Sequence, residues 1–217
     1  MAARIKLVDA TNPDPKLLRR AALLILKGEV VVCPTDTGYA LAANALDQKA
    51  IRKVFVLKGR SYLNPIHVVV SSMAEAEKYA FVNEAAEHLA RNFLPGALTL
   101  VMPKKEIIPS LLVGGGDTVG IRIPDNRVIL DLAAMTGVPL TATSANTSGS
   151  PATYTIQEVA DQTGEIIDHV RLVLDQGALS PRDSSTVIDL TTTPPHIVRE
   201  GRITREEIRK VLPSLEL

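Results

Sequence analysis

The chain has 217 residues, which suits one domain with a full hydrophobic core and leaves two small domains as the alternative. Its 46% hydrophobic and 22% charged residues are typical of a globular protein and exclude a disordered one. Lys plus Arg number 24, as do Asp plus Glu, so no overall positive field attracts nucleic acid or membrane, and polyanion binding would need a local cluster.

Strand and helix signals alternate from the start of the chain. A first strand is predicted at residues 5–8, and Asp14 followed by Pro15 predicts the start of a helix that Gly28 ends. The next signals, in order, are a strand at 30–33 that ends at Pro34, a helix capped by Asp47, a strand at 66–70, and helices capped by Ser72 and Asn83.

The same alternation continues to the C-terminus. A strand at 98–102 follows the turn of Pro95 and Gly96. After three glycines come a strand at 118–123, a helix near 128–135, a strand at 140–143, helices capped by Thr155 and Thr204, and between these two helices strands at 172–174, 186–190 and 197–199.

Strands interleaved with helices favour a layered α/β domain over separate all-α and all-β parts. No repeat and no long Gly/Ser or Pro linker divides the chain. The loop at 147–155 is the best candidate for a domain boundary, but a division there would separate the polar motifs described below. We therefore predict one domain over residues 1–217.

The single cysteine and the N-terminus indicate the compartment. Cys33 follows three valines, so we expect a small buried side chain, and one Cys excludes an intrachain disulfide and a CxxC metal site. No apolar segment of a signal peptide follows the basic residues at the start, and the apolar stretch 21–26 is far too short to span a bilayer. We expect a cytoplasmic protein that does not enter a membrane.

The common catalytic signatures are absent. The sequence contains no GxxxxGK[ST] phosphate loop, no GxGxxG fingerprint, no HExxH and no GxSxG. The histidines His67, His88, His169 and His196 are scattered without the spacing of metal ligands, which argues against a zinc site.

Two polar segments in the first half of the chain are candidates for binding. Residues 34–39 place two threonines and Asp36 after a buried strand, where α/β sheets bind ligands, although a simple turn would also use these residues. Residues 58–65 follow a helix end. Lys58 and Arg60 suit a triphosphate there, or they complement the helix dipole.

Two further polar segments lie in the second half. In residues 117–124, Thr118, Gly120 and Arg122 alternate with apolar residues, so an arginine projects from the polar face of a strand. Residues 141–149 form a run of hydroxyls with Asn146. Ser144 and its neighbours suit phosphate oxygens, and the amide suits an adenine edge, or the segment is an ordinary Ser/Thr turn.

Taken in chain order, these segments resemble the YrdC-like family of threonylcarbamoyl-AMP synthases, from about residue 30 to residue 201. Each motif alone is uninformative, whereas all of them in the same order are specific. The matching motifs are Pro34-Thr35-Asp36-Thr37 with Tyr39, Lys58-Gly59-Arg60 with Asn64-Pro65, Pro95-Gly96-Ala97-Leu98-Thr99, Thr118 with Arg122-Ile123-Pro124, Ser144-Ala145-Asn146 with Ser148-Gly149 and Pro151, Ser185-Thr186-Val187-Ile188-Asp189, and Arg199 with Gly201.

The resemblance implies a nucleotidyltransferase that converts L-threonine, bicarbonate and ATP to L-threonylcarbamoyladenylate and pyrophosphate. That product supplies the threonylcarbamoyl modification of adenosine 37 in tRNA through downstream transfer proteins. The implied fold is α/β, an open, strongly twisted mixed sheet flanked by helices, with a concave, positively charged cavity. In length the chain is similar to the short, single-domain branch of the family.

The resemblance also implies roles for individual residues. On the amino acid it places Thr37, His67, Arg122 and Ser185, with Arg122 pairing the threonine carboxylate. On ATP it places Lys58, Arg60, Asn64, Thr118, Ser144, Asn146 and Arg199. Lys58 and Arg60 act electrostatically, and no side chain is a covalent nucleophile. Mg²⁺ is implied with the nucleotide, and Asp36 and Asp183 are the acidic side chains to examine near it.

Three features depart from the family pattern. Many relatives carry a histidine where Val69 stands, and here His67 lies two residues earlier, on the same face of the predicted strand. Ala40 and Ala42 replace common glycines, which is similar to a paralogous branch, and Ser184 replaces a glutamate. A paralogue with a different small substrate is therefore one alternative to the synthase.

Two other classes stay open. A non-catalytic module for tRNA or double-stranded RNA could use the same cavity by shape and phosphate contacts, although only 3% of the residues are aromatic and none is Trp, which supplies little base stacking. Such a module would not need the set Thr37, Arg122 and Ser185. A scaffold for a partner protein is the third class, and it would bind no nucleotide.

Overall fold

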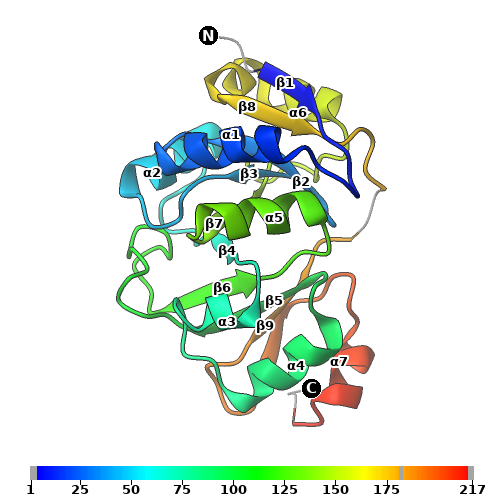
Figure 1. Ribbon diagram of the computed structural model, residues 1–217. Coiled ribbons are helices and arrows are strands. Elements are labelled where there is room, and N and C mark those ends of the chain that lie inside the picture. The colour runs from blue at the N-terminus through cyan, green and yellow to red at the C-terminus, as the bar shows by residue number, and fades with distance from the viewer. Residues whose placement is uncertain (1–3, 181–182, 215–217) are drawn as a thin grey trace.

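The computed structural model describes residues 4–180 and 183–214. Their strands form a ten-stranded sheet in the order β1-β8-β2-β3-β7-β4-β6-β5-β9-β10 (Figure 1). Parallel pairs such as β4 with β6 adjoin antiparallel pairs such as β5 with β6, so the sheet is mixed, as predicted. The strands are β1 (Arg4–Leu7), β2 (Val31–Thr35), β3 (Gly38–Ala42), β4 (His67–Val69), β5 (Leu98–Pro103), β6 (Thr118–Arg122), β7 (Leu140–Ser144), β8 (Leu172–Asp175), β9 (Thr186–Asp189) and β10 (His196–Arg199).

The helices are α1 (Pro15–Leu26), α2 (Gln48–Lys58), α3 (Met73–Ala76), α4 (Glu84–Phe93), α5 (Arg127–Thr136), α6 (Ile156–Thr163), the 3-10 helix η1 (Gly164–His169) and α7 (Arg205–Val211). Six helices begin at the predicted cap residues, a seventh (α5) lies near the predicted 128–135, and the 3-10 helix η1 was not predicted. Each predicted cap residue accepts a hydrogen bond from a backbone N–H in the first turn of its helix: Asp14, Asp47, Ser72, Asn83, Thr155 and Thr204. Local capping chemistry therefore sets these helix starts.

Successive residues of each strand pack on opposite faces of the sheet. On one face, Val31, Leu140 and Val69 belong to the hydrophobic cluster that α1 and α5 complete. On the other face, Val32 and Ile121 belong to a larger cluster that includes residues of α2, α4 and α7. Figure 1 shows α1 and α5 beside β2, β3 and β7, away from β5 and β9. Because α1 and α5 do not cover the first face at β5 and at the C-terminal part of β6, polar side chains can lie on that face there.

One predicted boundary is wrong. Pro34 does not end a strand, because β2 continues to Thr35 and pairs antiparallel with β3, a strand that the sequence did not predict. The parallel neighbour β8 pairs with β2 only at Val31 and Val32. Tyr39 lies opposite Pro34, and its backbone N–H donates to the carbonyl of Thr153 and not to β2. Pro34, which has no N–H, therefore costs no hydrogen bond between β2 and β3.

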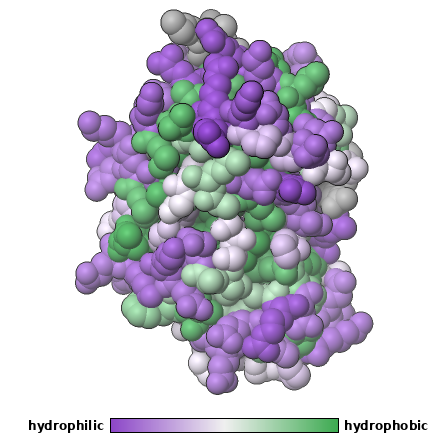
Figure 2. All heavy atoms as spheres, viewed as in Figure 1, coloured by the Kyte–Doolittle hydropathy of each residue, from purple (hydrophilic) through white to green (hydrophobic). Residues whose placement is uncertain are grey.

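The expectation of a buried cysteine is confirmed. Cys33 is fully buried, and burial raises the pKa of its thiol to about 12. Within residues 4–180 and 183–214, no helix has both the length and the apolar character needed to cross a bilayer. Figure 2 shows hydrophilic residues over the top and the bottom of the viewed face, with hydrophobic residues exposed between them.

Candidate functional site

A cavity of about 290 Å³ lies where the polar faces of β4, β6 and β7 meet the β2–β3 turn and the segment before β9. It brings together eight of the residues singled out from the sequence: Thr37, Arg60, His67, Arg122, Ser144, Asn146, Ser185 and Arg199. These residues lie as far apart as positions 37 and 199 in the chain, and the sheet order places them in one site.

Arg122 ends β6 on the polar face of that strand. Its Nη2 lies 2.5 Å from Oδ1 of Asp36, and its Nη1 donates to Oγ1 of Thr37 at 2.7 Å. Burial lowers the pKa of Arg122, and the carboxylate of Asp36 opposes this change. The Nε of Arg122 is buried and has no hydrogen-bond partner in the described part of the chain. Arg122 therefore keeps its Nε–H as a donor for a ligand.

Arg60 and Arg199 are each held along one edge by backbone carbonyls. Arg60 donates from Nε to the carbonyl of Asn64 at 3.3 Å and from Nη2 to that of Pro65 at 2.9 Å. Arg199 donates from Nε and Nη2 to the carbonyl of Ser185 at 3.3 and 2.8 Å. A guanidinium fixed along one edge can offer its other edge to an anion without losing further side-chain entropy.

His67 lies among these arginines and is neutral near pH 7. Burial lowers its pKa to about 4, and the charges of Arg199, Arg60 and Arg122 act in the same direction. The neutral ring has one donor and one acceptor nitrogen. Val69, two residues later on the same strand face, is fully buried in the cluster under α1 and α5, so of the two residues only His67 lines the cavity.

Lys58 lies behind the cavity wall and does not line it. Its Nζ donates to the carbonyls of Ser144 and Asn146 at 2.7 and 2.9 Å and to Oδ1 of Asn146 at 2.6 Å. Burial lowers the pKa of Lys58 to about 8. An ammonium has three hydrogens, and three acceptors at these distances use all of them. A contact from Lys58 to ATP stays a prediction.

The side chain of Asn146 forms hydrogen bonds within the loop at 144–151. Its Oδ1 also accepts from Oγ of Ser144 at 2.6 Å, and its Nδ2 donates to the carbonyls of Ser150 and Pro151 at 2.6 and 2.8 Å. Both ends of the amide are occupied, so its reading of an adenine edge, which was predicted as one possibility, would require these bonds to be exchanged. Ser144 retains acceptor capacity toward the cavity.

Besides Lys58, four predicted positions do not line the cavity. Asn64 is exposed and contributes its carbonyl to Arg60. Thr118 begins β6, on the same strand face as Arg122 but at the opposite end. Asp183 is exposed, whereas the side chain of Asp36 is 4% exposed and paired with Arg122. Their roles toward ATP or its metal ion stay predictions.

Thr99 also lines the cavity, although the sequence assigns it no role beyond its place in a matched motif. Its Oγ1 lies 2.9 Å from Oγ of Ser185, within hydrogen-bond distance. The sequence does contain a signal, because Leu98 and Leu100 face the core on either side of it, so a threonine between them belongs to the polar face of the strand.

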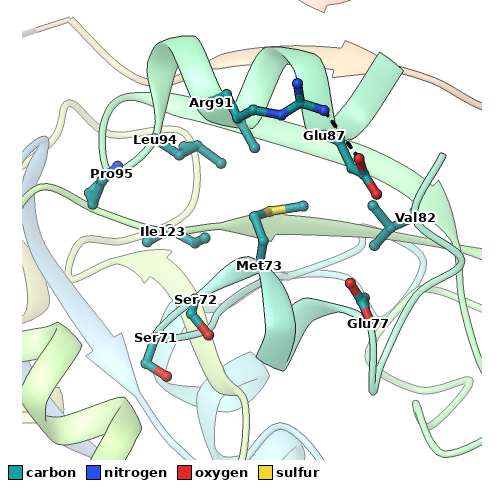
Figure 3. A pocket seen from close by; sticks show the side chains of 11 residues that line it. Ser71, Ser72, Met73, Glu77, Val82, Glu87, Arg91, Leu94, Pro95 and Ile123 are labelled. Carbon is teal, nitrogen blue, oxygen red and sulfur yellow. Dashed lines mark hydrogen bonds and ion pairs between the residues drawn. The ribbon is translucent and has the colours of Figure 1, made fainter. Parts of the chain in front are cut away.

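Figure 3 shows a second cavity, of about 410 Å³, between α3 and α4. Met73, Val82 and Leu94 give it an apolar lining, and at its edge Arg91 and Glu87 pair with each other at 3.2 Å. Ile123, the residue after Arg122, also lines this second cavity. It belongs to the larger hydrophobic cluster, on the sheet face opposite the side chain of Arg122. Few polar groups converge there, so the cavity of the arginines is the stronger candidate for a functional site.

Residues 23–201 match the model of the family Sua5_yciO_yrdC, described as telomere recombination. The threonylcarbamoyl-AMP synthase of Pyrococcus abyssi (strain GE5 / Orsay) is 39% identical over 201 residues, and the alignment covers 92% of this chain. This chain spans 58% of the length of that relative.

Solved structures agree with this result. The crystal structure of P. abyssi Sua5 complexed with L-threonine matches with a TM-score of 0.92 and 37% identity, covering 99% of this chain and 63% of that one. The crystal structure of E. coli YciO matches with a TM-score of 0.83 and 29% identity, covering 92% of this chain and 96% of that one. The predicted family and twisted, open α/β sheet are confirmed, and this chain belongs to the Sua5/YciO/YrdC family.

Proposed function

We propose that the protein is a threonylcarbamoyl-AMP synthase, a nucleotidyltransferase that uses L-threonine, bicarbonate and ATP to form L-threonylcarbamoyladenylate and pyrophosphate. The names of its relatives support this activity, and so does the P. abyssi Sua5 complex with L-threonine. The observation that carries the proposal is the convergence of Arg60, Arg122 and Arg199 with hydroxyl side chains in one cavity.

This arrangement suits transfer of an adenylyl group. The threonine amine and bicarbonate first condense to N-carboxythreonine with loss of water. Its carbamate oxygen then forms a bond to the α-phosphorus while the bond to pyrophosphate breaks, so the transfer needs alignment and charge neutralisation and no enzyme nucleophile. Correct orientation alone can lower such a barrier by about 7–11 kcal/mol. Guanidinium groups held by the protein neutralise the charge that develops on the phosphates.

We assign the residues of the cavity to the two substrates by their chemistry. Thr37, Arg122 and Ser185 would hold threonine, with the neutral ring of His67 as a further polar contact. Arg60, Arg199 and Ser144 would hold ATP, together with Asn64 and Thr118 from outside the cavity wall. Lys58 and Asn146 would shape the loop at 144–151.

Mg²⁺ would enter as part of the nucleotide substrate. In residues 4–180 and 183–214, no three His, Cys, Asp or Glu side chains cluster as metal ligands. The carboxylate of Asp36 is paired with Arg122, and Asp183 is exposed outside the cavity wall. Mg²⁺ retains water and binds phosphate oxygens readily, so ATP itself would supply most of its ligands.

The biological role would follow from the product. L-threonylcarbamoyladenylate is an activated acyl donor, and we place its use in the modification of adenosine 37 of tRNA, in the cytoplasm, by downstream transfer proteins. Direct contact with tRNA would need a basic surface. Helix α1 offers one, with a shallow cavity lined by Lys16, Arg19, Arg20 and Lys27.

The deciding experiment combines the purified protein with ATP, Mg²⁺, bicarbonate and labelled L-threonine and measures both the adenylate and pyrophosphate. Omission of bicarbonate should abolish both products. Arg122→Ala should abolish threonine-dependent pyrophosphate release while ATP binding is largely kept. A rate of pyrophosphate release that does not depend on the presence of threonine would refute the proposal.

Amino-acid choice separates the synthase from a paralogue with another small substrate. L-valine has the shape of threonine but lacks its hydroxyl, and a site that hydrogen-bonds that hydroxyl rejects it strongly. L-serine loses one methyl, which costs only about 1–3 kcal/mol. Serine should therefore react better than valine, and equal turnover of valine and threonine would contradict the assignment of threonine.

A further inference from the structure

The geometry points to Asp36 as the residue that positions Arg122, so that the guanidinium grips a substrate carboxylate side-on through Nε. This inference rests on the proposed function, because it takes the ligand at Arg122 to be the carboxylate of an amino acid.

Asp36 and Thr37 occupy the far end of the guanidinium. The carboxylate of Asp36 lies 2.5 Å from Nη2, with the two side chains 4% and 9% exposed. Thr37 accepts from Nη1 at 2.7 Å. Both terminal nitrogens are thereby directed at the β2–β3 turn, and the edge formed by Nε and the second hydrogen of Nη2 is left.

The remaining edge has the chemistry of a ligand site. Nε of Arg122 is buried and makes no hydrogen bond within the described residues, while Arg122 itself lines the cavity. A buried donor on a charged group is costly to leave without an acceptor. A carboxylate matches two parallel guanidinium N–H groups, so an amino-acid substrate would supply the missing acceptor.

The turn that carries Asp36 is itself held in place. Oγ1 of Thr35 donates to the carbonyl of Gly38 at 2.7 Å and accepts from the backbone N–H of Thr37 at 3.1 Å. Gly38 has a φ of 125°, and a Cβ there would lie 2.8 Å from the carbonyl oxygen of Thr153, so the turn packs closely against a neighbouring segment. A carboxylate on such a turn can orient the arginine before substrate arrives.

If Asp36 positions Arg122, loss of Asp36 should weaken recognition of the substrate carboxylate. Asp36 lies on the β2–β3 turn and contacts Arg122, so its loss should weaken the grip on a carboxylate and leave ATP binding unaffected. L-threoninol has a hydroxymethyl group in place of the carboxylate, so its binding does not depend on the orientation of the Arg122 guanidinium. Its inhibition constant should therefore not change when Asp36 is replaced.

The test measures the KM for L-threonine, the KM for ATP and kcat of pyrophosphate release, together with competitive inhibition by L-threoninol. The variants are Asp36→Ala, Asp36→Asn and, as the matched control, Asp125→Asn. Asp125 is an exposed carboxylate three positions after Arg122, and it borders the same neighbouring cavity as Asp36. Circular dichroism and thermal melts establish that each variant folds.

Asp36→Ala should raise the KM for L-threonine about tenfold or more, with kcat, the KM for ATP and inhibition by L-threoninol within about threefold of wild type. Asp36→Asn keeps an oxygen acceptor and should stay within about threefold throughout, as should Asp125→Asn. An unchanged threonine KM in Asp36→Ala, or an equal weakening of threonine and threoninol, overturns the inference. Absence of threonine-dependent activity in the wild-type protein would instead refute the proposed function.

A measurement on the wild-type protein covers the case in which Asp36→Ala does not fold, since it leaves a buried charge unpaired. Arg122→Lys assigns the Nε–H signal of Arg122 in the ¹⁵N spectrum. Saturating L-threonine should shift that signal, and L-threoninol should leave it in place. A signal that does not respond to bound threonine contradicts the side-on grip.

Discussion

Gly120 and His67 share one small volume on neighbouring parallel strands. A Cβ on Gly120 would lie 2.5 Å from Cδ2 of His67 and 3.1 Å from Cγ2 of Thr99. The pairing of Val68 with Ile121 places the histidine beside the glycine across β4 and β6. The missing side chain of Gly120 therefore allows the imidazole to lie over the strand and reach the cavity.

Gly120→Ala should displace the His67 ring into the cavity. We expect a loss of about 1–3 kcal/mol in stability, typical of an overpacked site, and a larger fractional loss of threonine-dependent activity. Gly116→Ala is the control, because its Cβ would approach only the carbonyl of Val113, at 3.3 Å. Thermal melts and the pyrophosphate assay measure both effects, and a fully active Gly120→Ala would show that the ring position is unimportant.

His67 should contribute to acid sensitivity. Its pKa is lowered to about 4 in the folded protein, against 6.5 ordinarily, so below pH 6.5 the unfolded chain binds a proton that the folded chain does not. Stability is therefore lost as the pH falls from 6.5 toward 4. Urea unfolding across this range should show a smaller loss in His67→Gln than in wild type, and equal slopes would contradict the lowered pKa.

Lys58→Met should loosen the loop at 144–151. It removes the donor for three acceptors, and unsatisfied buried polar groups cost about 1–3 kcal/mol each. Because Ser144, Asn146 and Ser150 line the cavity, the affinity for ATP should also fall. Lys53→Met on the same helix is the control, since the side chain of Lys53 is 46% exposed and its ammonium pairs with Glu29. Denaturant unfolding and calorimetry measure the two effects, and a Lys58→Met protein as stable as the control would contradict this role.

ATP binding should depend on Arg60 and Arg199. Each substitution to Ala removes a charge-assisted contact, and we expect each to weaken ATP binding about tenfold or more by calorimetry. Arg91→Ala is the matched control, because Arg91 pairs with Glu87 on α4 outside this cavity. Unchanged ATP affinity in both variants would remove the nucleotide from this cavity.

The sequence alone predicted most of the helix starts and the family. Helix starts depend on contacts within four residues, as at Asp14 and Thr204, so capping signals predicted them. The motifs in order predicted which segments would form the site, and eight of the eleven chosen residues line one cavity. The extent of a single domain over residues 1–217 stays a prediction.

Only the tertiary structure decided strand β3 and the partners of the site residues. β3 is stabilised by pairing with β7, about a hundred positions away, and no local pattern records that contact. Lys58 meets Asn146 across 88 positions, and Arg122 meets Asp36 across 86, so residue type alone left open whether each cation faces a ligand or the protein. Hydrogen-bond geometry answers that question, because a donor is available to substrate only where the folded chain has not already supplied an acceptor.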